Sequence, residues 1–141
     1  MVDDFLKASH ARFQKEVNEQ WETAANADQE HLQTLTKDET FDYAYLLYGY
    51  ASHIQDELNM QQIALDWCND KLDKMVAKNY HQLDSYMKYE TKRNMIVIND
   101  EYARVVDHYR EIALSRVNSL ENRAKDLRRK ADILLEKGKR L

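Results

Sequence analysis

The feature that most constrains this chain is a long heptad seam in residues 36–79. Apolar or small side chains recur there at alternating steps of three and four residues. The seam positions are Ala44, Leu47, Ala51, Ile54, Leu58, Gln61, Leu65, Cys68, Leu72 and Met75. Such spacing over about five heptads predicts a helix that packs a narrow apolar stripe against a partner helix.

Residues that interrupt helices are almost absent from the chain. Its 141 residues include no proline and only two glycines, Gly49 and Gly138. Little therefore obliges the backbone to turn, which favours a few very long helices. An elongated monomer buries a small share of its surface, so we expect a homo-oligomer.

The remaining elements are placed by capping residues and apolar spacing. We expect an amphipathic helix over residues 2–26, a polar linker over 24–37 with one loose turn, and a second helix opened by the capping box of Thr36 and Glu39. A turn at 79–84 leads to a third helix from Ser85 to about Lys137, with Gly138 as its stop. Its expected inner stripe is Met95, Ile98, Tyr102, Val106, Tyr109, Ala113, Val117, Leu120, Ala124, Leu127, Ala131 and Leu134.

The predicted fold is therefore all-α: a long antiparallel, coiled-coil-like helical hairpin with an additional N-terminal amphipathic helix. We expect residues 1–35 to form an acidic N-terminal helix and linker, and residues 36–141 to form the hairpin that carries oligomerisation and the candidate binding surface. Gly49 indicates a place where another backbone comes close. Trp21 either anchors another protein or packs on its own bundle, and the second case is commoner. We hypothesise that Gln61, a polar residue on the seam, fixes the register in which the helices pack.

Residue patterns typical of enzymes and metal sites are missing from the sequence. There is no Glu-x-x-His pair, no glycine-rich phosphate loop and no G-x-S-x-G elbow, so we expect no metal, no cofactor and no enzymatic activity. Cys68 lies on the seam and is interpreted as a buried thiol in a reducing compartment. No apolar run approaches the roughly 18 residues of a membrane span, and no secretion signal is evident, which predicts a cytoplasmic protein.

Charge is distributed unevenly along the chain. Residues 1–71 hold 5 Lys or Arg against 14 Asp or Glu, whereas residues 72–141 hold 16 against 11. This imbalance indicates either a polyanionic partner for the basic half or an acidic arm that docks on a basic surface.

Basic residues alternate with tyrosines around the expected turn. The candidate nucleic-acid-binding residues are Lys71, Lys74, Lys78, Lys88, Lys92, Arg93, Tyr80, Tyr86 and Tyr89. Cations neutralise phosphates, and aromatic rings stack under unpaired bases, so this pattern favours single-stranded DNA as a ligand. The alternative is that the lysines are simply solvated and the tyrosines pack the tip of the hairpin.

A second basic run lies near the C-terminus. Its central residues are Arg123, Arg128, Arg129 and Lys130. We favour helix packing or phosphate contact for this secondary patch, and salt bridges to the acidic arm explain it equally well.

Three segments resemble the phage UvsY recombination-mediator family. They are FDYAYLLYGYASHIQDEL, WCNDKLDKMVAKNY and SLENRAKDLRRKADILLEKGKRL, within residues 41–141. The resemblance implies a small all-helical protein that binds single-stranded DNA, forms a ring-like homo-oligomer and helps a RecA-like recombinase displace single-strand-binding protein. It places the DNA-binding lysines at Lys71, Lys74 and Lys78, and it implies the host cytoplasm for a phage-encoded protein. The acidic arm over residues 2–26 has no clear counterpart in that family.

Two functions therefore remain open from the sequence. The first is a non-enzymatic, homo-oligomeric mediator that binds single-stranded DNA. The second is a coiled-coil scaffold that assembles proteins without touching nucleic acid.

Overall fold

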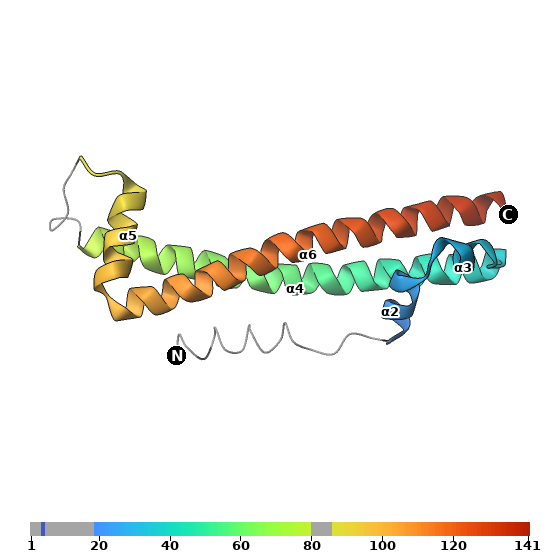
Figure 1. The fold of residues 1–141 in the computed structure, drawn as a ribbon, viewed down its shortest axis with the longest axis horizontal. Helices are drawn as coiled ribbons and strands as arrows, with labels where there is room; N and C mark the ends of the chain where they lie inside the picture. Colours follow the sequence, from blue (N-terminus) through green and yellow to red (C-terminus); the bar gives the residue numbers. More distant parts are fainter. Residues whose placement is uncertain (1–3, 5–18, 80–85) are drawn as a thin grey trace. The chain divides into compact units, whose positions relative to one another are not determined.

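The computed structural model describes residues 4, 19–79 and 86–141, and every element among them is helical. In chain order the helices are α2 (Glu19–Asn26), α3 (Gln29–Gln33), α4 (Lys37–Lys78), α5 (Tyr89–Asn99) and α6 (Glu101–Arg140), as Figure 1 shows. The long helix α4 packs antiparallel against the long helix α6, and α2 precedes them. The predicted all-α hairpin with an N-terminal helix is thus confirmed; the part of that helix over residues 5–18 lies outside the described residues.

The helix α4 begins at the predicted capping box. The Glu39 N–H donates to Thr36 Oγ1 at 3.2 Å, and the Thr36 N–H donates to Glu39 Oε1 at 3.2 Å. The hydrogen bond from the Thr36 backbone lowers the pKa of the Glu39 carboxyl. The reciprocal bonds satisfy two backbone donors that the first turn would otherwise leave unpaired.

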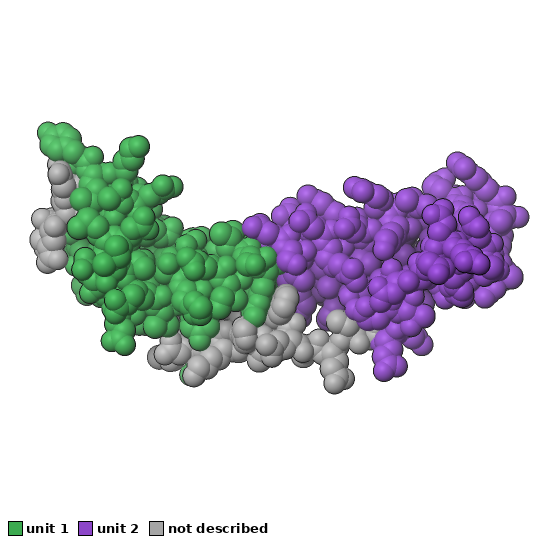
Figure 2. Space-filling view, viewed as in Figure 1, with its two compact units in different colours: residues 1–9, 59–117 green, residues 10–58, 118–141 purple. Residues whose placement is uncertain are grey.

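The described residues form two compact units, and α4 and α6 contribute to both (Figure 2). One unit comprises described residues of 59–117, and its buried apolar residues include Ala64, Leu65, Cys68, Leu72, Val76, Ile96, Ala103, Val106, Ala113 and Val117. The other comprises described residues of 10–58 with 118–141, and its core is Ala24, Ala25, Ala44, Leu47, Tyr50, Ala51, Ile54, Leu120, Ala124, Leu127, Ala131 and Leu134. Eight of the ten seam positions predicted in residues 36–79 are buried, whereas Leu58 and Met75 are only partly buried.

The third predicted helix is broken at Asp100, so a continuous helix from 85 to 137 was wrong. Asp100 has an extended backbone (φ −124°, ψ 119°), and its N–H donates to the Ile96 carbonyl at 2.9 Å. Its side-chain Oδ1 accepts the Ala103 N–H at 3.0 Å, so the same residue ends α5 and caps α6. The turn residues Asp84 and Ser85, predicted as caps, lie outside the described residues.

The break at Asp100 changes which residues face inward. Met95, Ile98 and Tyr102, predicted on the inner stripe, are exposed, with Ile98 at 66%. Ile96 and Ala103 are buried instead. From Val106 onward the predicted stripe is buried except at Tyr109, which is partly buried, because α6 is uninterrupted there.

Both glycines are close-contact positions within helices. Gly138 does not stop α6, which continues to Arg140; a Cβ at this position would lie 2.7 Å from Cε1 of Phe41. A Cβ at Gly49 would lie 3.3 Å from Nε1 of Trp21, so a side chain, rather than the predicted backbone, comes close there. A side chain at Gly138 would require the Phe41 ring to shift, whereas the contact at Gly49 is tight but longer.

The predicted linker over residues 24–37 is mostly structured. Ala24 and Ala25 are buried in α2, and α3 starts after Asp28, whose Oδ1 accepts the His31 N–H at 2.7 Å. Trp21 stacks on Tyr50 with ring centroids 5.7 Å apart, so it packs on its own bundle. We call residues 19–33, comprising α2 and α3, the strap.

The helices in the described part of the chain are not apolar enough over a sufficient length to cross a bilayer. Cys68 is completely buried, and burial raises the pKa of its thiol to about 11. The interpretation of Cys68 as a buried seam thiol is confirmed.

Candidate nucleic-acid interface

Three predicted lysines gather in one hollow. Lys71, Lys74 and Lys78 follow one another at helical spacing over the last two turns of α4. With Tyr102 from the first turn of α6, and with Met75, Asn79 and Asp100, they line a space of about 340 Å³. We call Lys71, Lys74, Lys78 and Tyr102 the lysine hollow.

The lysines of the hollow have weak existing contacts. Lys71 Nζ lies 5.7 Å from the centroid of the Tyr102 ring, within the range of a cation–π contact. Lys74 Nζ lies 2.9 Å from Asp70 Oδ2, but both side chains are more than half exposed. Such exposed ion pairs contribute about 0–1 kcal/mol, so a phosphate can replace the carboxylate at little cost.

Tyr102 is the residue of the hollow that sequence reasoning did not identify. Its side chain is 38% exposed beside Lys71, whereas the apolar spacing placed it on the inner stripe. The change follows from the Asp100 cap, which starts α6 in a new register. An Asp followed by Glu101 in the first turn is a helix-start signal, and it was available in the sequence.

Two other predicted residues, Tyr89 and Arg93, join α5 to α4, and a third, Lys92, is buried. Lys92 is buried, with 8% of its surface exposed. Arg93 donates from a terminal guanidinium nitrogen to Asn69 Oδ1 at 2.6 Å, and the Tyr89 hydroxyl donates to Asp73 Oδ1. These contacts position the helix that precedes the Asp100 break.

The residues next to the turn are only partly described. Tyr86 is 95% exposed and Lys88 is exposed, immediately before α5. Tyr80 lies outside the described residues. Tyr86 and Lys88 therefore lie on accessible surface of the same compact unit as the lysine hollow.

The secondary basic patch contacts the strap. The Arg123 guanidinium lies 5.3 Å from the centroid of the Tyr50 ring and donates to its hydroxyl at 3.4 Å. That hydroxyl donates to Glu22 Oε1 at 2.7 Å, and Lys130 Nζ donates to the Ala25 carbonyl at 3.2 Å. Burial raises the pKa of the Tyr50 hydroxyl.

The other two patch residues differ from each other. Arg128 donates to Gln55 Oε1 at 2.7 Å, which joins α6 to α4, and Arg129 is exposed. Of the acidic arm, the described residue Glu22 contacts the same chain through the Tyr50 hydroxyl, which also accepts a hydrogen bond from Arg123.

Groups that could hold a metal ion do not occur among the described residues, where no three His, Cys, Asp or Glu side chains cluster. The described residues thus form an all-α helical hairpin that carries a surface of lysines and a tyrosine. Comparisons with protein-family models, curated proteins and solved structures give no match to this chain.

Proposed function

We propose that this chain is a non-enzymatic protein that binds single-stranded DNA through the lysine hollow. The observation that carries the proposal is the grouping of Lys71, Lys74 and Lys78 around the partly exposed Tyr102 ring. The three cations lie on one helical face, at intervals of one turn, where consecutive phosphates of an extended strand can meet them.

Tyr102 supplies the feature that distinguishes a single strand from a duplex. Its ring borders a space of about 340 Å³ in which an unpaired base can stack. A stacked base contributes about 1–3 kcal/mol and requires no particular sequence. Paired bases present no free face, so duplex binding keeps only the phosphate contacts.

The biological role that we propose is recombination mediation. The UvsY-like helix layout supports a homo-oligomer that holds single-stranded DNA and helps a RecA-like recombinase replace single-strand-binding protein. In this role the chain supplies binding and positioning only, and the recombinase supplies the ATP hydrolysis.

The test is the salt dependence of binding measured by fluorescence anisotropy of a labelled single strand. Each lysine that contacts a phosphate contributes about 0.7 to the slope of log K against log salt. We expect the triple variant Lys71→Gln, Lys74→Gln, Lys78→Gln to reduce this slope by about 2.

The matched control is Lys37→Gln, Lys125→Gln, Lys139→Gln, which changes the net charge equally at exposed positions outside the hollow. The control should bind nearly as tightly as the wild-type chain. An equal loss of DNA affinity in both triple variants would refute a defined site and leave only general charge attraction.

A coiled-coil scaffold is the second candidate, and exposed aliphatic side chains favour it. Ile63 on α4, and Leu114 and Ile133 on α6, are large apolar residues on exposed helical faces. A scaffold function requires that partner helices cover these positions. This function is supported if the wild-type chain binds no single strand at low salt yet sediments as a defined assembly.

A further inference from the structure

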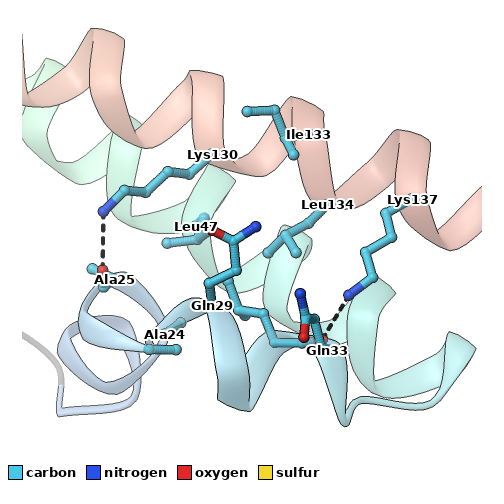
Figure 3. A pocket seen from close by; sticks show the side chains of 11 residues that line it. Ala24, Ala25, Gln29, Gln33, Leu47, Lys130, Ile133, Leu134 and Lys137 are labelled. Carbon is cyan, nitrogen blue, oxygen red and sulfur yellow. Dashed lines mark hydrogen bonds between the residues drawn. The ribbon is translucent and has the colours of Figure 1, made fainter.

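A second pocket lies under the strap. It is lined by residues other than those of the lysine hollow. Its volume is about 430 Å³, within the range of small-molecule sites. The residues that matter for recognition are Leu32, Leu47, Ile133, Leu134, Lys130 and Lys137. Figure 3 shows Lys130 and Lys137 at opposite ends, with Leu47 and Leu134 between them. We call this the strap pocket.

The two lysines bridge α6 to the ends of the strap helices. Lys130 Nζ donates to the Ala25 carbonyl at 3.2 Å, and Lys137 Nζ donates to the Leu32 carbonyl at 2.7 Å. Both carbonyls lie in the last turn of a strap helix, and the Leu32 carbonyl also accepts the Leu35 N–H at 3.5 Å. Each ammonium has three N–H donors, and these contacts use one apiece.

The chemistry of the pocket selects for an anion with an apolar body. Its described lining includes two lysines and two glutamines, Gln29 and Gln33, but no carboxylate. The positive charge inside the pocket is therefore not compensated by its own lining. Leucine and isoleucine side chains form the remaining walls and favour aliphatic chain over water.

We propose that the strap pocket binds a small amphipathic carboxylate, with the aliphatic chain against Leu47 and Leu134 and the carboxylate on Lys130 or Lys137. An inorganic anion would leave the apolar walls wet, and a neutral hydrocarbon would leave the ammonium donors unused. Both halves of the ligand are therefore needed for tight binding.

The test is a titration of the full chain with decanoate, below its critical micelle concentration, followed by methyl NMR. We expect saturable shifts of the Leu32, Leu47, Ile133 and Leu134 methyl groups. Decanol has the same chain without the charge and should bind about tenfold more weakly, the factor that corresponds to one lost charge-assisted hydrogen bond. Equal affinity for decanol, or no saturable shift, would overturn the proposal.

Variants separate the pocket from adventitious binding. Ile133→Glu puts a negative charge on the pocket wall at a side chain that is 61% exposed, so we expect an intact fold and loss of decanoate binding. Because the carboxylate lies on Lys130 or Lys137, the double variant Lys130→Gln, Lys137→Gln should weaken binding about tenfold, and the exposed Lys125→Gln should leave it unchanged. Equal weakening by Lys125→Gln would overturn the site.

Two further measurements keep the test decisive. Ala27→Leu narrows the pocket without touching either lysine, so it should also weaken decanoate binding, and unchanged affinity would count against the site. If the same methyl groups shift with protein concentration alone, a second copy of the chain occupies the pocket, and the carboxylate proposal fails.

Discussion

Removing the Asp100 side chain tests how the cap, the helix register and the lysine hollow depend on one another. Asp100 Oδ1 accepts the Ala103 N–H at 3.0 Å and so starts α6. Replacing an N-cap residue with alanine costs about 0.5–2 kcal/mol. We expect Asp100→Ala to lower the free energy of unfolding by about 1 kcal/mol, which lowers Tm by a few degrees in a chain of this size.

Asp100→Asn separates the cap from the charge. Asparagine caps helices about as well as aspartate, so this variant should unfold near the wild-type midpoint. It also removes the only carboxylate among the described residues that line the lysine hollow. The loss of this exposed repulsion is worth up to about 1 kcal/mol, so single-stranded DNA should bind up to about fivefold more tightly.

The assays are urea denaturation followed by circular dichroism and anisotropy at one fixed salt concentration. The expected result is lower stability for Asp100→Ala, wild-type stability for Asp100→Asn and tighter DNA binding for Asp100→Asn. If Asp100→Ala is as stable as the wild-type chain, the Asp100 cap does not stabilise the start of α6. If Asp100→Asn binds DNA no more tightly, the strand does not pass this hollow.

Three further predictions concern the rest of the fold. Trp21→Ala removes the ring that stacks on Tyr50 and should cost about 2–3 kcal/mol in urea denaturation; no change would mean that the strap adds nothing to stability. Gly138→Ala should destabilise the chain despite the better helix propensity of alanine, because its Cβ meets Phe41, and Phe41→Leu should restore stability in the double variant. Burial raises the pKa of Cys68 from 9.0 to about 11, so its contribution to stability is complete below pH 9 and is lost as the pH rises through 11; Cys68→Ala should flatten that alkaline decline in thermal melts.

The sequence predicted elements whose signals are local and repeated. The heptad spacing of α4 and the Thr36 capping box were sufficient, because each position in them is constrained by neighbours three or four residues away. The α6 stripe from Val106 onward was predictable for the same reason.

The errors arose where one polar residue outweighed a continuous apolar pattern. Asp100 breaks a helix that spacing alone would continue, and Asp28 starts the helix α3 where only one loose turn was expected within a linker. Gly138 was interpreted as a stop signal because a glycine near a helix end usually is one; its reason here is the Phe41 ring, which lies almost a hundred residues away in sequence. A contact between residues so far apart in sequence cannot be inferred from the local residue pattern.

The candidate site was predicted in part. The spacing of Lys71, Lys74 and Lys78 placed them on one face, and the structure brings them together. It could not indicate that Lys92 turns inward or that Tyr102 joins the hollow, because both depend on the packing of α5 and on the break that follows it.

The most direct measurement is photocrosslinking of the full chain to a single strand that carries iododeoxyuridine, followed by mass spectrometry of the crosslinked peptides. We predict a crosslink at Tyr102 that disappears at high salt and in the triple variant Lys71→Gln, Lys74→Gln, Lys78→Gln. Crosslinks confined to other tyrosines, or a Tyr102 crosslink that survives the triple substitution, would contradict the lysine hollow as the binding site.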